Sequence, residues 1–187
     1  MINWGEEFYE HYEKFLKTAV DRKIYQSPDG NSSIQILVYE KVFKGCKVFA
    51  SLGLTHYISD VKNVAEVVLV VDDGFEYCPT ILANTLFYMI NEQLPMTRGA
   101  SVKGIRNINR EFVDKYGKNV LYFTAPFAFP DEFQIVDSCF EKGKIFMACL
   151  ISDDESGYLK EFGADRFESS LEQQCVDVFD IRRPSIV

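Results

Sequence analysis

The sequence has 187 residues, of which 47% are hydrophobic and 26% are charged, and this composition excludes a disordered or fibrous chain. Such a length can bury a substantial core, so residues 1–187 are expected to form a single domain. The formal net charge of −8 comes mainly from residues 131–187, which carry 13 Asp and Glu against six Lys and Arg. A negative surface repels nucleic-acid phosphates and favours a cationic partner, although an acidic face that only aids solubility explains the same charges.

The sequence predicts a reducing, cytoplasmic location. The N-terminal stretch is acidic and has no basic region followed by an apolar one, and no apolar run is long enough to cross a bilayer. The cysteines are odd in number and include no C-x-x-C pair, so neither a disulfide framework nor a zinc site is indicated. Reduced thiols in or near the core are expected for Cys46, Cys78, Cys139, Cys149 and Cys175.

Residues 3–20 predict an amphipathic helix that packs on a sheet. Glu7 and His11 lie one helical turn apart and could in principle bind a metal, but no further His or Cys nearby completes a ligand set. An ordinary solvated helix face is therefore favoured for these two residues. The apolar stripe, spaced by three and four, consists of Trp4, Phe8, Tyr12, Phe15, Leu16 and Ala19.

The chain is organised around two central strands within residues 47–71. Residues 48–54 and 64–71 are apolar runs, rich in β-branched residues and too short for ordinary helices. Residues 67–71 show no polar alternation, which is typical of a strand covered on both faces, so helices are expected over the sheet. Ile34, Ile36 and Val38 alternate with polar neighbours, which predicts a half-buried strand. Further strands are predicted at residues 120–125, 145–151 and 175–181, with a short strand at residues 133–136.

Three more helices are predicted after the central strands. One covers residues 79–94 and begins with a proline, which suits the first helical position. Asp153 or Asp154 is expected to cap an acidic helix that ends at Gly163. The last helix follows at residues 164–173.

Residues 98–118 are rich in Lys and Arg. They include Gly99 and Gly104 with four residues between them, which is the start of a phosphate-loop pattern. The pattern then fails, because Ile105 and Arg106 stand where Lys and Ser or Thr are required. A nucleotide loop is therefore rejected, and a solvated connecting segment is favoured over a basic loop that contacts a phosphate or an acidic surface.

The sequence contains few candidate catalytic residues. His56 could act as a base for a nucleophile such as Ser51 or a cysteine, but no complete hydrolase or metalloenzyme motif accompanies it. Asp72 and Asp73 follow a buried strand, where α/β enzymes place carboxylates, yet D-D-G is also an ordinary turn. A non-enzymatic role without cofactor or metal is therefore expected. The alternative is a hydrolase or transferase that uses His56 with Asp72 or Asp73.

Several short motifs occur in an order that resembles the suppressor-of-fused family. FASLGLTHY at residues 49–57 is similar to that family's T-x-G-[LM]-S segment, with Ser51 where Thr is more usual. A strand beginning at Glu66 and a long helix follow it. Near the C-terminus, an acidic helix start precedes a D-x-x-R-x-S run, here Asp180, Arg183 and Ser185. The likeness covers nearly the whole chain.

This resemblance implies a single α+β domain with a mixed, mostly antiparallel β-sheet and helices packed on it. A lone domain of this length is similar to the bacterial members of the family, such as the YqcF-type antitoxins, which act as immunity proteins against polymorphic nuclease toxins. The resemblance implies that the chain neutralises a toxin by direct binding, with no catalytic residue, cofactor, nucleic acid or membrane involved. A regulator that sequesters another protein and is unrelated to toxins is a further alternative.

The predicted binding face is a patch of carboxylates on the two C-terminal helices. A nuclease toxin needs a basic surface to hold phosphates, so an inhibitor gains association rate and specificity from carboxylates that take the place of nucleic acid. Tyr158 lies among them and is expected to act as an aromatic anchor. A solvated helix face explains the same charges. The acidic members of the predicted patch are Asp153, Asp154, Glu155, Glu161, Asp165 and Glu168.

Overall fold

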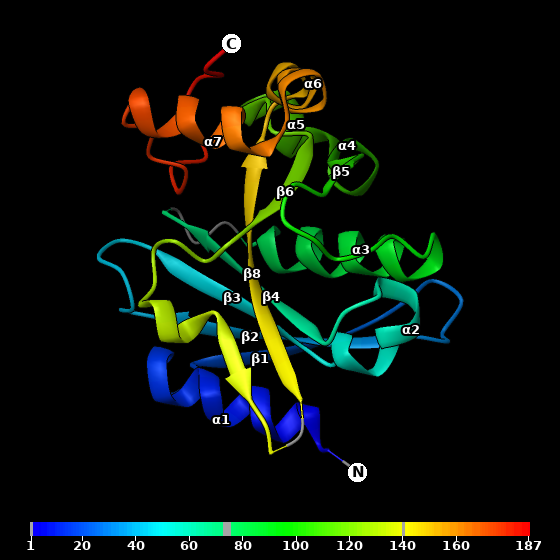
Figure 1. The fold of residues 1–187 in the computed structure, drawn as a ribbon. Coiled ribbons are helices and arrows are strands. Elements are labelled where there is room, and N and C mark those ends of the chain that lie inside the picture. The colour runs from blue at the N-terminus through cyan, green and yellow to red at the C-terminus, as the bar shows by residue number, and fades with distance from the viewer. Residues whose placement is uncertain (1, 73–75, 140) are drawn as a thin grey trace.

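The computed structural model describes residues 2–72, 76–139 and 141–187, which form one mixed sheet with helices packed on it (Figure 1). The strand order is β1-β2-β3-β4-β8-β6-β5, and β7 pairs with β8. Among the described pairs, β4 and β8 are parallel and the others are antiparallel, which confirms the predicted α+β fold. The strands are β1 (Asp21–Gln26), β2 (Ser33–Glu40), β3 (Lys47–Leu52), β4 (Ala65–Val71), β5 (Ser101–Lys103), β6 (Val120–Thr124), β7 (Ile135–Asp137) and β8 (Lys142–Ile151).

The helices lie at both ends and over both faces of the sheet (Figure 1). Within the described ranges, no helix is both long and apolar enough to cross a membrane. The helices are α1 (Trp4–Leu16), α2 (Ile58–Val61), α3 (Cys78–Asn91), α4 (Ile105–Ile108), α5 (Arg110–Tyr116), α6 (Asp153–Phe162) and α7 (Ala164–Gln173), with short 3₁₀ turns η1 (Leu54–Tyr57) and η2 (Asp131–Phe133).

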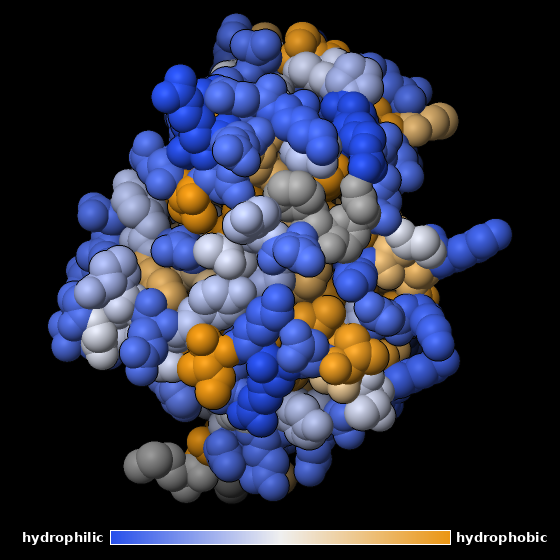
Figure 2. All heavy atoms as spheres, turned by 180° about the vertical axis from the view of Figure 1, so that it is seen from behind, coloured by the Kyte–Doolittle hydropathy of each residue, from blue (hydrophilic) through white to orange (hydrophobic). Residues whose placement is uncertain are grey.

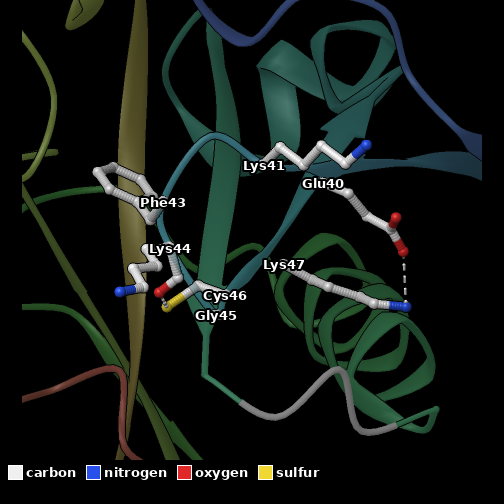
Figure 3. A pocket seen from close by; sticks show the side chains of 7 residues that line it. All are labelled: Glu40, Lys41, Phe43, Lys44, Gly45, Cys46 and Lys47. Carbon is white, nitrogen blue, oxygen red and sulfur yellow. Dashed lines mark hydrogen bonds and ion pairs between the residues drawn. The ribbon is translucent and has the colours of Figure 1, made fainter.

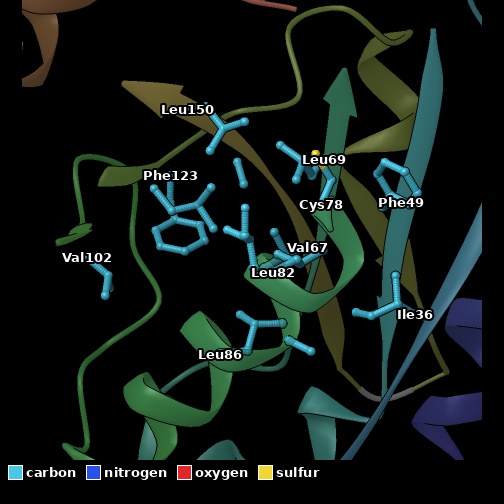
Figure 4. Packing of buried hydrophobic residues seen from close by; sticks show 14 of the residues in the cluster. Ile36, Phe49, Val67, Leu69, Cys78, Leu82, Leu86, Val102, Phe123 and Leu150 are labelled. Atoms are coloured by element: carbon cyan, nitrogen blue, oxygen red, sulfur yellow. The ribbon is translucent and has the colours of Figure 1, made fainter. Parts of the chain in front are cut away.

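The central strand β4 is buried along its whole length, as its continuous apolar run predicts. Alternate side chains of a strand point to opposite faces, so Val67 and Leu69 enter one core cluster while Val68 and Val70 enter the other. Helix α3 covers the first face, and its Leu82 and Leu86 belong to the same core cluster as Val67 (Figure 4). Strand β2, predicted to be half-buried, also has buried side chains on both faces, because the α1 side of the sheet is covered too.

Helix α1 covers the other face of the sheet with its predicted stripe. Trp4, Phe8, Tyr12 and Leu16 are buried against that face. The helix ends at Leu16, earlier than predicted, because Lys17 adopts a left-handed conformation with φ of 71°.

The sheet also differs from the prediction in strand β1 and at residues 175–181. Strand β1 was not predicted, because this edge strand is mostly exposed and its sequence shows no apolar alternation. The strand predicted at residues 175–181 is wrong: Cys175 is left-handed with φ of 50°, and the amide of Val176 donates to the carbonyl oxygen of Leu171 at 3.0 Å. The chain therefore turns back onto α7 instead of joining the sheet.

The surface carries small apolar groups separated by hydrophilic side chains on the face seen in Figure 2. The five cysteines are free thiols, as predicted. Cys78 and Cys149 are buried and Cys46 is half-buried, whereas Cys139 and Cys175 are exposed, so their predicted place in or near the core is wrong.

A glycine of β8 allows α1 to approach the sheet closely. A Cβ atom on Gly143 would lie 2.6 Å from the Phe8 ring and 3.2 Å from the Trp4 ring, and both rings are buried. We expect Gly143→Ala to lower the free energy of unfolding by about 1–3 kcal/mol, because α1 must shift away from the sheet. Urea denaturation measures this change.

The matched control is Gly157→Ala, because a Cβ at this position of α6 meets no atom within 4 Å. Alanine favours a helix over glycine, so this variant should be unchanged or more stable by up to about 1 kcal/mol. Equal stability of Gly143→Ala and the parent chain would contradict the close approach of α1.

Candidate protein-binding site

The two candidate catalytic residues, His56 and Asp72, lie at opposite ends of one strand pair. Strands β3 and β4 run antiparallel; His56 follows β3 and Asp72 follows β4. The length of β3, about 20 Å at roughly 3.4 Å per residue, therefore separates them. Ser51 is buried, and its hydroxyl donates to Glu66 at 2.5 Å. The alternative of a catalytic pair between His56 and Asp72 is wrong, and Asp73 lies outside the described residues.

His11 contacts the protein interior. Its Nε2 lies 3.1 Å from the carbonyl oxygen of Phe133, and its ring stacks on the Phe133 ring with centroids 5.8 Å apart. Burial lowers the pKa of His11. Because a carbonyl oxygen can only accept a hydrogen bond, the Nε2 atom donates to it. Within residues 2–72, 76–139 and 141–187, no three or more His, Cys, Asp or Glu side chains gather closely enough to hold a metal ion.

A buried carboxylate, Glu66, joins β4 to the turn after β3. Its oxygens accept hydrogen bonds from the Ser51 hydroxyl at 2.5 Å, the Gly53 amide at 2.8 Å and the Thr55 amide at 3.2 Å. Gly53 adopts φ of 111°, a conformation that glycine reaches without strain, and this turns its amide toward the carboxylate. Burial raises the pKa of Glu66 to about 7, although the hydrogen bonds oppose the shift.

This pKa predicts a measurable dependence of stability on pH. A carboxyl group whose pKa is raised on folding stabilises the folded state fully below its ordinary pKa, which is 4.5 for Glu66. This contribution to the free energy of unfolding is lost as the pH rises through the folded pKa of about 7. We expect the free energy of unfolding of the parent chain to fall by about 2.5 kcal/mol more between pH 5 and 8 than that of Glu66→Gln, at roughly 1.36 kcal/mol per pKa unit.

Urea denaturation of both proteins at the two pH values tests this, since the other titrating groups are common to both and cancel in the difference. The same pH dependence in the two proteins would show that Glu66 does not titrate in this range.

A second buried carboxylate, Glu155, holds the C-terminal segment against α6. Arg183 donates to its Oε1 at 2.5 Å and to its Oε2 at 3.2 Å, and Lys118 Nζ lies 3.9 Å from Oε2. All three side chains are buried. Burial raises the pKa of Glu155, but the bonds from Arg183 and the Ser152 amide outweigh it, so this pKa lies below its ordinary value.

Glu155 is therefore not part of an exposed patch, and that part of the prediction is wrong. The helix cap is Ser152, one residue before the predicted Asp153, and it forms a capping box with Glu155. Ser152 and Glu155 have the S-x-x-E spacing of this motif, which turns the carboxylate back toward the start of the helix. That spacing was the sequence signal for the inward position of Glu155.

The basic segment at residues 98–118 folds against the acidic helices and is not a solvated connection. It contains β5, α4 and α5. Arg98 Nη1 lies 2.7 Å from the carboxylate of Asp165, and Arg98 also pairs with Glu168. Lys103 Nζ lies 2.9 Å from Asp153. These cations neutralise part of the predicted acidic patch.

Glu168 fixes α7 to strand β6. The hydroxyl groups of Tyr122 and Thr124 each donate to its Oε1 at 2.5 Å, while Arg98 binds Oε2. Burial raises the pKa of this half-buried carboxyl, but these bonds outweigh it, so the pKa lies below its ordinary value. The main contacts of Glu168 are therefore inside the molecule.

The exposed remainder of the predicted patch is smaller than the sequence suggested. Asp153, Asp154, Glu161 and Asp165 are exposed, and the side chain of Asp165 is 90% accessible. Tyr158 is half-buried and packs on the Phe162 ring with centroids 4.5 Å apart. The structure thus leaves an acidic surface on α6 and the start of α7, with an aromatic pair beside it.

A separate hollow of about 530 Å³ lies at the turn between β2 and β3 (Figure 3). Glu40 and Lys47 form an ion pair of 3.0 Å at its edge, and Phe43 and Cys46 line it. Burial raises the pKa of the Cys46 thiol, which disfavours the reactive thiolate. This hollow presents no activated nucleophile.

Comparison with known proteins identifies the family. The family model of the suppressor of fused protein (SUFU) matches residues 30–184. The chain belongs to the suppressor-of-fused family. Over 169 residues, it is 26% identical to a protein named immunity protein YqcF, from Bacillus subtilis (strain 168), and the match covers 87% of this chain and 86% of that protein.

Solved structures show the same suppressor-of-fused fold. A homologue from Neisseria gonorrhoeae FA 1090 superposes with a TM-score of 0.76 at 18% identity, covering 99% of this chain and 97% of that one. A chain of the Sufu-Fu complex superposes with a TM-score of 0.63 at 13% identity, and the match covers 97% of this chain and 90% of that one.

The suppressor-of-fused motifs of this chain lie in its two buried carboxylate clusters. The T-x-G-[LM]-S segment supplies Ser51, Gly53 and Thr55, which bind Glu66. In the D-x-x-R-x-S run, Arg183 binds Glu155, and the Ser185 hydroxyl lies 3.0 Å from that of Ser152. These motif residues support the fold from within.

Proposed function

We propose that this chain is a cytoplasmic immunity protein that binds a cognate polymorphic toxin with a nuclease domain and neutralises it by direct contact. The observation that carries this proposal is the match to immunity protein YqcF over most of both chains. The separation of His56 from Asp72 by the length of β3 also supports binding over catalysis.

The proposed contact surface is the exposed part of the acidic helices. Asp153, Asp154, Glu161 and Asp165 are exposed, with Tyr158 beside them. A nuclease domain holds phosphates with basic side chains, so this surface complements it and competes with the nucleic acid. Glu168 contributes by fixing α7 to β6, and Glu155 contributes by holding α6 to the C-terminal segment.

Protection of a toxin-expressing cell tests the proposal. The candidate toxin is the product of the open reading frame next to this gene, and its nuclease domain is expressed from an inducible promoter. Cells that also express this chain should grow, whereas cells with an empty vector should not. Equal growth arrest with and without the chain would contradict the proposal.

The same assay separates binding from catalysis. We expect His56→Ala combined with Asp72→Asn to protect cells as well as the parent chain does, because neither side chain lies in a catalytic arrangement. The result is read as colony counts, with circular dichroism to confirm the fold. A folded variant that no longer protects would favour an enzymatic mechanism.

A further inference from the structure

A hollow of about 490 Å³ lies beside the acidic helices, between three segments of the chain. Its walls are the end of β6 with Phe127 beyond it, the side of α7 at Leu171, and the segment after α7 at Val176 and Val178. The segment after α7 folds back beneath that helix (Figure 1). The volume lies within the roughly 300–1,000 Å³ range of ligand pockets.

An aromatic side chain stands at the mouth of this hollow. Phe127 is 63% exposed, although a phenyl ring gains free energy when it is buried. Its amide donates to the carbonyl oxygen of Ala125 at 2.8 Å, and the buried Phe129 stacks on Phe133 with centroids 4.3 Å apart. The loop is thus anchored from below while Phe127 faces solvent, so a partner group that covers this ring would gain the free energy of burying it.

The charged residues that line the hollow, Glu168 and Glu172, are both acidic. Asp165, Glu168 and Glu172 follow one another at spacings of three and four along α7, which places them on one side of the helix. Arg98 pairs with Asp165 and Glu168, and Glu172 lies at the far end, where it lines the hollow with Glu168. Among the described lining residues there is no Lys or Arg.

We propose that this hollow is a docking site for a segment of the partner protein that presents an aromatic side chain next to Arg or Lys. The apolar walls and Phe127 would bury the ring, and Glu172 would pair with the cation. A phosphate-bearing or acidic ligand is disfavoured by the carboxylates. The inference rests on the proposed function, since it takes the partner to be a protein. The carboxylates of the acidic helices would attract the partner, and the hollow would then bind one of its segments.

Acetyl-Phe-Arg-amide and acetyl-Phe-Glu-amide are the probes that test this site, added to the full chain labelled with ¹⁵N. We expect the first dipeptide to bind with a millimolar dissociation constant and to shift the amide resonances of Leu171, Cys175 and Val176. The second should bind at least about fivefold more weakly, since its carboxylate meets Glu172 and Glu168.

Two variants test which side chains bind the probe. Phe127→Ala should raise the dissociation constant of the Phe-Arg dipeptide at least about fivefold. Glu172→Lys should abolish the preference of the site for the Phe-Arg over the Phe-Glu dipeptide. Tyr88→Ala is the matched control, because Tyr88 is another exposed aromatic residue but lies outside the hollow and the acidic helices. Absence of binding at 10 mM, equal binding of both dipeptides, or shifts confined to other surfaces would overturn the inference. These outcomes do not depend on protection from a toxin, so failure of this site and failure of the proposed function are distinguishable.

Discussion

Arg183→Met is expected to lower the free energy of unfolding by about 3–5 kcal/mol, because it leaves a buried carboxylate without its main partner. Arg183 donates to both oxygens of Glu155 and lies 3.4 Å from the carbonyl oxygen of Leu150. After its loss, the cationic neighbour that remains to Glu155 is Lys118, at 3.9 Å. The C-terminal segment would then separate from α6. Urea denaturation monitored by circular dichroism measures the loss.

The neighbouring Arg182→Met is the control for this experiment. Arg182 is exposed and lies 4.0 Å from Asp72, so its removal should cost less than about 1 kcal/mol. The double variant Glu155→Gln, Arg183→Met should lose less free energy of unfolding than its two single variants lose in sum, because it removes both charges of the pair together. Equal losses for Arg182→Met and Arg183→Met would show that the buried pair does not stabilise the fold.

Charge reversal on the acidic helices is expected to slow association with the cognate toxin at least about tenfold at low salt. The variant is Asp154→Lys, Glu161→Lys, Asp165→Lys, and its three carboxylates are exposed. Reversal weakens the long-range attraction that steers two oppositely charged proteins together. Because salt screens this attraction, the deficit should shrink as the salt concentration rises. Surface plasmon resonance measures the association rate at several salt concentrations.

A control variant with the same change of net charge is Glu10→Lys, Glu92→Lys, Glu132→Lys, since these carboxylates are exposed on other parts of the molecule. We expect it to slow association far less than the variant of the acidic helices. Glu168 is left unchanged in both, because its bonds to Tyr122 and Thr124 fix α7. Equal association rates for the two variants would place the toxin interface elsewhere.

The central strands and long helices could be predicted because their patterns are local. The unbroken apolar run of β4 and the stripe of α1 each indicate their own burial. Strand β1 could not be found in this way, because it is held by pairing with β2 and not by apolar side chains of its own. The family resemblance implied a mixed, mostly antiparallel sheet, but the strand order was not predicted, because no single segment specifies it.

The candidate site was harder to predict because its members depend on distant partners. The S-x-x-E spacing indicates that Glu155 bonds to the start of its helix, but its pairing with Arg183, 28 residues later, is not visible in any local pattern. Glu168 similarly owes its position to Arg98, 70 residues earlier. The hollow beside Phe127 is formed by three segments that are separate in sequence, so no local pattern indicates it.

A stoichiometric titration of nuclease activity tests the central claim most directly. Purified toxin domain at a fixed concentration is mixed with increasing amounts of this chain, and the remaining cleavage of nucleic acid is measured. Neutralisation by tight binding predicts that activity falls in proportion and reaches zero near one equivalent, with a dissociation constant in the nanomolar range or below, about −12 kcal/mol. Complete loss of activity with a small fraction of an equivalent, growing with time, would reveal a catalytic mechanism and contradict the account.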